Sequence, residues 1–189
     1  MRRLVERVLR RYAAAQARDV APWIVGKRVL DLGAGEGFVT AALGRGVAAD
    51  VGPFRRAAAG PYVVYDGRAL PFDDDAFDTT LLLLVLHHCG APGAVLDEAL
   101  RVTRRRVIVT ESVHRNRLDL ALLNALDARF NRWRHGGRMP APVAFRTPGE
   151  WEALFAARDV RLVTARWLGS RWERLVHHPR LYVLDRPAS

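Results

Sequence analysis

The sequence predicts an α/β protein in which a mostly parallel sheet carries helices on both faces. A short, largely apolar run at residues 29–32 leads directly into three glycines at alternate positions, and a helical pattern follows from Phe38. A second, continuous apolar run at residues 81–86 is typical of a strand that is buried on both faces. Further short β-rich segments alternate with helical patterns along the chain, which favours parallel strands joined by helices.

Length and composition predict one domain over residues 1–189, because half of the residues are hydrophobic and can form a sizeable core. The longest apolar run is far shorter than the roughly 20 residues that a membrane span needs. Charged residues interrupt the first stretch, so no signal-peptide core is expected and a cytoplasmic protein is the default. Cys89 is the only cysteine, which excludes an internal disulfide and disfavours a cysteine-built metal site.

The formal net charge of +10 raises the possibility of a nucleic-acid partner. Lys27 is the only lysine, and the arginines are scattered instead of forming one basic block with interleaved aromatic residues. This distribution favours a solvated or anion-attracting surface, with nucleic acid as the less favoured partner.

Residues 3–17 form the first expected helix, in which Leu4, Val8, Tyr12 and Ala15 share one face opposite the arginines. Residues 1–25 are therefore expected to cap the domain. Such an amphipathic helix could also lie on a membrane surface or cover a substrate pocket, and these alternatives stay open.

The glycine turn has the pattern D-x-G-x-G-x-G, formed by Asp31, Gly33, Gly35 and Gly37. A dinucleotide fingerprint would need a glycine at position 38, where this chain has Phe38. The turn instead resembles motif I of the class I methyltransferases that use S-adenosylmethionine (SAM). The ammonium of SAM favours an acidic neighbour such as Asp31, and glycines let the backbone approach the ligand. The resemblance implies SAM contacts at Gly33, Ala34, Gly35 and Gly37, and a Rossmann-like, seven-stranded, mostly parallel sheet with an antiparallel C-terminal hairpin.

The next two strands carry the other expected SAM contacts. Residues 47–51 form a short strand that ends at Asp50, whose carboxylate the resemblance places on the ribose hydroxyls, beside Val51. Residues 62–65 form another strand, and the following segment resembles the family pattern "D-A-x-x-L-P-F … F-D". That resemblance implies that Asp66 binds the adenine amino group and that the Gly67 amide meets the ring.

The segment V-L-H-H after the long apolar run, with a proline turn and a helix at residues 93–102, also resembles this family. The resemblance implies that the backbone of Leu82 or Leu83 meets the SAM amino group, and that His87 and His88 stand at the reactive end. The adjacent pairs His87-His88 and His177-His178 do not have the spacing of ligands on one face. No metal is therefore expected.

The second half of the chain begins with a strand at residues 106–110 that ends at Glu111, where Arg104, Arg105 and Arg106 replace the family's "R-P-G-G" turn. A helix at 117–130 and a loop at 134–146 follow. Thr147 and Glu150 have capping-box spacing at the start of a helix that runs to residue 157. Strands at 161–168 and 180–185 would complete the hairpin, and F-R-T-P-G-E-W-E-A-L-F resembles a late element of the family.

The resemblance implies direct in-line transfer of the methyl group of SAM to an acceptor, with S-adenosylhomocysteine (SAH) as the product. Candidate bases are His88, then His114 and Glu111. The inserted segment 117–146 is expected to form an apolar pocket wall from Leu118, Leu122, Leu126, Trp133, Met139, Pro142 and Phe145.

A hydrophobic or aromatic small-molecule acceptor would suit that wall, anchored by an anionic group on Arg132, Arg134 or Arg138. Gly136 and Gly137 suit a loop that opens and closes over the site. Two alternatives remain, a nucleic-acid methyltransferase and a SAM-binding protein without turnover. No N-P-P-Y string follows the fourth strand, which favours the small-molecule acceptor over nucleic acid.

Overall fold

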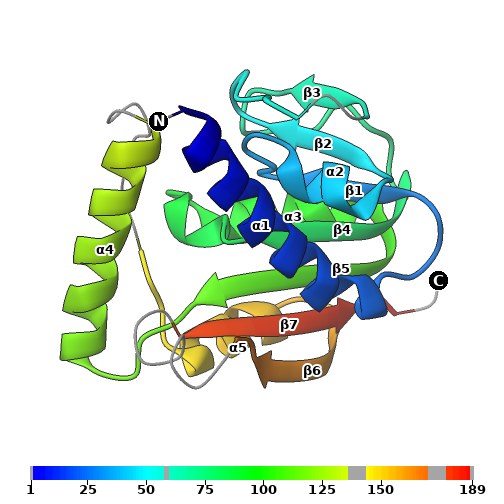
Figure 1. The fold of residues 1–189 in the computed structure, drawn as a ribbon. Coiled ribbons are helices and arrows are strands. Elements are labelled where there is room, and N and C mark those ends of the chain that lie inside the picture. Colours follow the sequence, from blue (N-terminus) through cyan, green and yellow to red (C-terminus); the bar gives the residue numbers. More distant parts are fainter. Residues whose placement is uncertain (1, 58–59, 136–143, 170–177, 188–189) are drawn as a thin grey trace.

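The structure is a computed structural model that describes residues 2–57, 60–135, 144–169 and 178–187. Its seven strands form one sheet in the order β3-β2-β1-β4-β5-β7-β6 (Figure 1). The strands are β1 (Val29–Leu32), β2 (Val47–Asp50), β3 (Tyr62–Val64), β4 (Phe77–Leu83), β5 (Thr103–Ser112), β6 (Arg161–Trp167) and β7 (Pro179–Asp185). Strands β1 to β5 pair in parallel, and β7 is antiparallel to both β5 and β6. The predicted mostly parallel sheet with an antiparallel C-terminal hairpin is confirmed.

Successive strand residues supply two separate cores, because they point to opposite faces of the sheet. On one face, Leu82 and Val107 pack with α3 (Pro92–Val102) and α5 (Pro148–Ala156). On the other face, Leu81 and Ile108 pack with the end of α1 (Arg2–Val20) and with α2 (Phe38–Leu43). Helices therefore cover both faces, as predicted.

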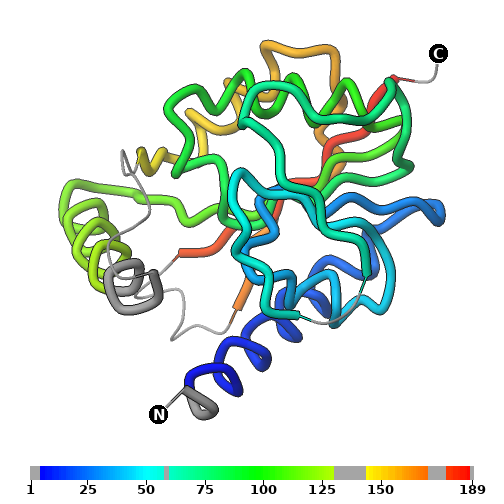
Figure 2. Tube along the Cα trace, turned by 90° about the horizontal axis from the view of Figure 1, so that it is seen from above, coloured from blue at the N-terminus to red at the C-terminus, as the bar shows by residue number. Residues whose placement is uncertain are grey.

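The carboxyl ends of the parallel strands share one edge, which Figure 1 shows on the left. The N-terminal half of α1 and the long helix α4 (Arg117–His135) lie on that side, and the view from above in Figure 2 agrees. Helix α1 continues into a short 3-10 helix, η1 (Ala21–Trp23), before β1 begins. Within the described residues, no helix is long and apolar enough to cross a membrane.

The boundaries of β4 differ from the prediction of a strand at residues 81–86. The strand begins earlier, at Phe77, and ends at Leu83. Leu84 has a left-handed backbone (φ 60°), and its amide donates to the Thr110 carbonyl at 2.8 Å. Leu86 then opens the 3-10 helix η2 (Leu86–His88) but stays fully buried in the core. The apolar run thus combines a strand with a packed turn, and composition does not separate the two.

Candidate active site

The glycine turn after β1 adopts a backbone that favours glycine. Gly33, Gly35 and Gly37 have φ values of 75°, 54° and 75°. The amides of Gly33 and Ala34 both donate to the Ala49 carbonyl in β2, at 2.8 and 3.1 Å. A Cβ atom at Gly33 would lie 2.5 Å from the Val85 side chain, so the turn also packs against the residues after β4. The turn is therefore fixed between the ends of β2 and β4, the two strands that flank β1.

Asp50, at the end of β2, holds this turn with both carboxylate oxygens. Oδ2 accepts a hydrogen bond from the Gly35 amide and Oδ1 accepts one from the Val51 amide, both at 2.7 Å. Burial raises the pKa of Asp50 above its usual value, although these backbone hydrogen bonds act to lower it. Each carboxylate oxygen has a second lone pair, so the side chain keeps capacity to accept hydrogen bonds from a diol.

Asp31, inside β1, is an almost completely buried acid beneath the turn. It is 2% exposed, and its Oδ2 accepts a 2.6 Å hydrogen bond from the Thr40 hydroxyl. Burial raises the pKa of Asp31 to about 6, while the hydrogen bonds from Thr40 act to lower it. A buried carboxylate with raised pKa is stabilised by a nearby cation. The hydrogen-bond acceptors of the turn, the carboxylates of Asp31 and Asp50, thus fit a ligand that carries both an ammonium group and a diol.

Tyr62 and Glu36 also belong to the turn, and the sequence analysis did not identify them. The Tyr62 hydroxyl lies 2.8 Å from the Gly35 carbonyl and 3.1 Å from the Gly52 carbonyl. Glu36 is 2% exposed, and its carbonyl accepts hydrogen bonds from the amides of Arg56 and Ala57. A tyrosine at the start of a β-rich segment looks like an ordinary strand former, so its sequence carries no signal for this contact.

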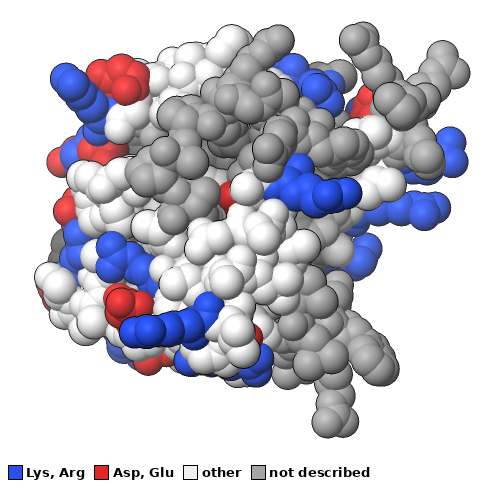
Figure 3. All heavy atoms as spheres, turned by 90° about the vertical axis from the view of Figure 1, so that its left-hand side faces the viewer, with Lys and Arg blue, Asp and Glu red and all other residues white. Residues whose placement is uncertain are grey.

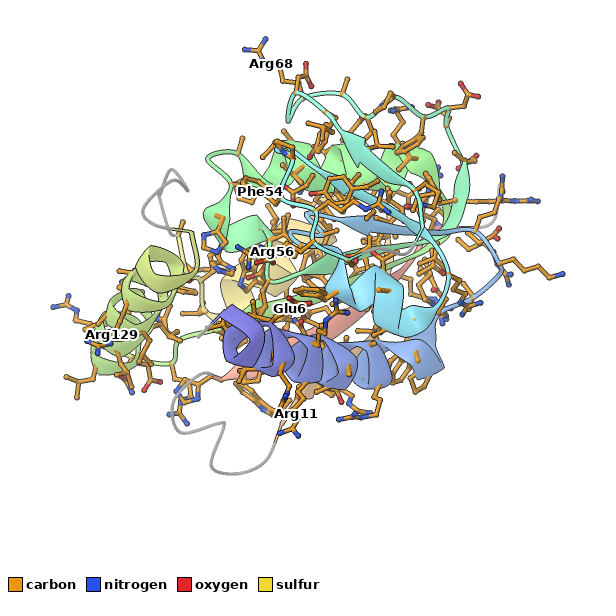
Figure 4. The ribbon with its side chains drawn as sticks, turned by 45° about the horizontal axis from the view of Figure 1, so that its top comes forward. Glu6, Arg11, Phe54, Arg56, Arg68 and Arg129 are labelled. Carbon is orange, nitrogen blue, oxygen red and sulfur yellow. The ribbon has the colours of Figure 1, made fainter. Side chains whose placement is uncertain are left out.

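Asp66 and Gly67 lie in the loop after β3, next to the end of β2. Asp66 is exposed, and its Oδ1 accepts hydrogen bonds from the amides of Arg68 and Ala69, which lower its pKa. Gly67 has φ 80°, and a Cβ there would lie 3.3 Å from Cγ1 of Val51. Figure 4 shows Arg68 pointing outward from this loop. Val51 and Gly67 thus lie side by side at the rim of the turn.

His87 and Glu111 form a buried pair where β4 and β5 end. His87 Nδ1 lies 2.5 Å from Glu111 Oε2, and Glu111 Oε1 accepts the Leu86 amide at 2.7 Å. The His87 ring stacks on Phe145, with ring centroids 4.8 Å apart. Burial acts to lower the pKa of His87, but the charge and hydrogen bond of Glu111 outweigh it and the pKa is raised. Glu111 is fully buried, so it holds His87 and the preceding turn instead of facing a pocket.

His88 extends this pair toward helix α4. Its ring centroid lies 4.0 Å from that of His87, and its Nε2 lies 3.8 Å from Oδ1 of Asp127. Atoms of metal-ligand type on His87, His88 and Asp127 all lie within 4.8 Å of one another. Asp127 comes from an element 39 residues beyond His88 and has no motif around it, so sequence reasoning did not identify it.

Two other expected site residues, His114 and Leu83, have side chains that the structure describes, whereas several expected pocket residues do not. The His114 amide donates to the Arg146 carbonyl, and its Nδ1 is buried with no hydrogen-bond partner among the described residues. Leu83 ends β4 beside the glycine turn, as the expected backbone contact requires. Six residues predicted to line or anchor the acceptor pocket have side chains outside the described part of the structure. They are Arg132, Trp133, Arg134, Arg138, Met139 and Pro142.

Helix α4 presents an apolar stripe at four-residue spacing. Leu118, Leu122 and Leu126 are 82%, 41% and 37% exposed. Val8 and Tyr12 on α1 are also exposed large side chains. Figure 3 views the molecule from the side of α4, and it shows Lys and Arg side chains projecting around this face, with acidic groups beside several of them.

Comparison with known proteins shows, independently of the site geometry, that part of this chain is similar to methyltransferases. Residues 30–109 match the family model described as a methyltransferase domain. A demethylmenaquinone methyltransferase from Clavibacter sepedonicus is 39% identical over 117 residues, which cover 53% of this chain and 46% of that protein. The chain thus matches less than half the length of this relative.

Two solved structures show the same fold at low sequence identity. Magnesium protoporphyrin IX methyltransferase from Synechocystis PCC 6803, solved with bound SAH, is 16% identical with a TM-score of 0.65, over 94% of this chain and 83% of that one. The [4+2]-cyclase SpnF is also 16% identical, with a TM-score of 0.70, over 93% of this chain and 81% of that one. Because a [4+2]-cyclase shares this fold, the fold alone does not define a reaction. The glycine turn and its buried acids lie within residues 30–109, the part of the chain that matches the methyltransferase-domain family model.

Proposed function

We propose that the protein transfers the methyl group of SAM to a small, largely apolar molecule bound at the carboxyl edge of the sheet. The observation that carries the proposal is the continuous run of contacts along that edge. Asp50 holds the glycine turn, Gly33 packs against Val85, and His87 follows two residues later in the hydrogen bond to Glu111. A ligand in the turn would therefore place its far end next to the histidines.

The residues of the turn would bind SAM in chain order. The buried Asp31 carboxylate, together with the backbone at Leu83, would favour the ammonium end, although Asp31 contacts Thr40 in this structure. Asp50 would accept the ribose hydroxyls with the second lone pair of each oxygen. Val51, Asp66 and Gly67 would receive the adenine, since Val51 and Gly67 already lie in contact range.

SAM supplies an activated methyl carbon, so the protein chiefly has to orient an acceptor and exclude water from it. His87 is held from one side by Glu111 and stacked by Phe145 on its face, which gives it a fixed orientation. Glu111 is then a positioning residue, not the direct base that the sequence suggested. His88, with its side chain 19% exposed, is the better placed of the predicted bases to reach an acceptor.

The acceptor would lie between this edge and helix α4. The leucines of α4 supply an apolar wall, and the basic side chains around this face favour an acceptor that carries an anionic group. The similar proteins named above for demethylmenaquinone and magnesium protoporphyrin IX support a small-molecule acceptor over a nucleic acid.

The test has two stages. Calorimetry with SAH should first show saturable binding, which Asp50→Ala weakens. The protein is then incubated with methyl-labelled SAM and separate extracts of RNA and of small molecules, and the labelled product is identified by mass spectrometry. Label in the small-molecule extract is expected. Label in RNA alone would contradict the acceptor class, and SAH binding without label in either extract would indicate a binding protein without turnover.

A further inference from the structure

We propose that His87, His88 and Asp127 form a site for a divalent transition-metal ion of the Zn²⁺ type. Two imidazoles and one carboxylate are the ligand set of many zinc sites that keep one position open for water or substrate. The three candidate ligand atoms lie within 4.8 Å of one another and come from two elements, η2 and α4. No metal was expected from the sequence, because the adjacent histidine pairs lack the spacing of ligands on one face, and Asp127 lies 39 residues away from His88.

Glu111 provides a second, independent observation. Metal-bound histidines commonly donate the other ring N–H to a carboxylate, which fixes the tautomer and the ring orientation. His87 Nδ1 lies 2.5 Å from Glu111 Oε2, and Glu111 is itself held by the Leu86 amide. With the proton on Nδ1, the lone pair of His87 is on Nε2. The pair therefore has the arrangement of a metal ligand and its supporting carboxylate.

His88 and Asp127 complete the ligand set from the more exposed side. Their side chains are 19% and 15% exposed, whereas His87 is 3% exposed, so an ion and a fourth ligand can enter from this side. Tetrahedral bonds of about 2.0–2.1 Å require ligand atoms roughly 3.3 Å apart. The 3.8 Å between His88 Nε2 and Asp127 Oδ1 is close to that value. The largest separation, at most 4.8 Å, would have to shrink by up to about 1.5 Å, which side-chain rotations can supply.

Other acidic and histidine groups in the described residues are engaged differently. Asp74 and Asp75, in the turn before β4, pair with Arg101 and Arg186, so arginines already neutralise these two carboxylates. His178 contacts Arg115 and Asp119, which places a guanidinium where an ion would need to bind. Among the described residues, the group of His87, His88 and Asp127 is the one that meets the geometry.

The open position of the ion would face the edge where the methyl acceptor is proposed to bind. A hydroxyl or other oxygen of the acceptor could then occupy that position and be oriented toward the methyl donor, and the bound ion would take the place of His88 as the group that activates it. This role rests on the proposed function, but the existence of the site does not. The binding test below uses no SAM and no acceptor, so failure of one proposal is distinguishable from failure of the other.

The experiment titrates the full, chelator-treated chain with ZnCl₂ by calorimetry, and with CoCl₂ by visible absorption. A single saturable ion per chain is expected. Asp127→Ala removes one ligand and should lower the Zn²⁺ affinity at least about tenfold. Glu111→Gln should lower it about 10- to 100-fold, because the amide would donate to Nδ1 and shift the proton to Nε2.

The matched control is Asp119→Ala, the same substitution two turns earlier on α4. Asp119 contacts His178, so this variant also tests whether that second histidine–aspartate contact binds the ion. It should leave the Zn²⁺ affinity unchanged. SAH affinity measured on each variant reports whether it is folded.

Absence of saturable Zn²⁺ binding to the unaltered chain would overturn the proposal. Equal Zn²⁺ affinity of the unaltered chain and Asp127→Ala would also overturn it, and this variant is expected to fold because alanine favours helix.

Discussion

Replacing Asp50 by alanine tests the proposed role of the cofactor turn most directly. The substitution removes the acceptor for two part-buried backbone amides, those of Gly35 and Val51. Each amide left without an acceptor costs about 1–2 kcal/mol. Removing a carboxylate whose pKa burial has raised returns part of that loss. We expect the free energy of unfolding to fall by about 1–3 kcal/mol in total.

The effect of Asp50→Ala on SAH affinity should be larger. Two charge-assisted hydrogen bonds to the ribose, each worth about 1.5–3 kcal/mol, correspond to a loss of at least about 100-fold. Urea unfolding and calorimetry measure the two effects separately. Asp66→Ala is the control for stability, since Asp66 also accepts two backbone amides but is exposed, so water can replace it. An unchanged SAH affinity in Asp50→Ala would remove Asp50 from the binding site.

Three further predictions follow from the same region and from the cap of α5. Gly33→Ala should unfold at a lower urea concentration than Gly44→Ala, because both replace a left-handed glycine but only Gly33 has Val85 in the way; equal midpoints would contradict the packing argument. SAH affinity should fall about tenfold between pH 7 and pH 5, because the ammonium needs the carboxylate form of Asp31, whose pKa is about 6. Asp31→Asn should flatten that profile, and a profile that keeps its slope would assign the proton to another group. Thr147→Ala should cost about 1 kcal/mol in chemical unfolding through loss of the observed capping box, and no loss would contradict its contribution.

The raised pKa of Asp31 also predicts how the stability of the cofactor-free protein depends on pH. The pKa is raised from 3.8 in the unfolded reference to about 6 in the fold. The folded state therefore holds the proton more tightly, and this contribution to stability is fully present below pH 3.8 and is lost as the pH rises through 6. A bound cation would reverse the trend, because it favours the ionised carboxylate. Unfolding measured with and without SAH across this range distinguishes the two cases.

The positions of the glycine turn and of Asp50 at one edge of the sheet could be predicted because these residues follow one another along the chain. The glycine turn is a contiguous motif, and Asp50 follows Gly33 by 17 residues at the end of the next strand. The paired strands then place both at one edge. The sheet could be predicted for the same reason, since each strand is a local pattern and parallel pairing follows from the intervening helices.

Contacts between distant elements could not be predicted. Asp127 reaches His88 only because α4 returns to the carboxyl edge, and Tyr62 in β3 reaches the Gly35 carbonyl past the end of β2. The burial of Glu111 could not be predicted either: the sequence offered it as a candidate base, and the fold buries it completely in its hydrogen bond to His87. These features depend on how elements pack, which local residue patterns do not encode.

The packing of α1 on α2 couples the start of the chain to the glycine turn after β1. Leu9 and Ala13 pack against Phe38, the first residue of α2, and Arg10 stacks over the Phe38 ring at 4.7 Å. Since α2 begins directly after Gly37, any movement of α1 displaces the end of the turn. Occupancy of the turn should consequently slow amide hydrogen exchange throughout α1. The N-terminal helix can thus serve as a natural reporter of cofactor occupancy, read by exchange mass spectrometry without a label in the site.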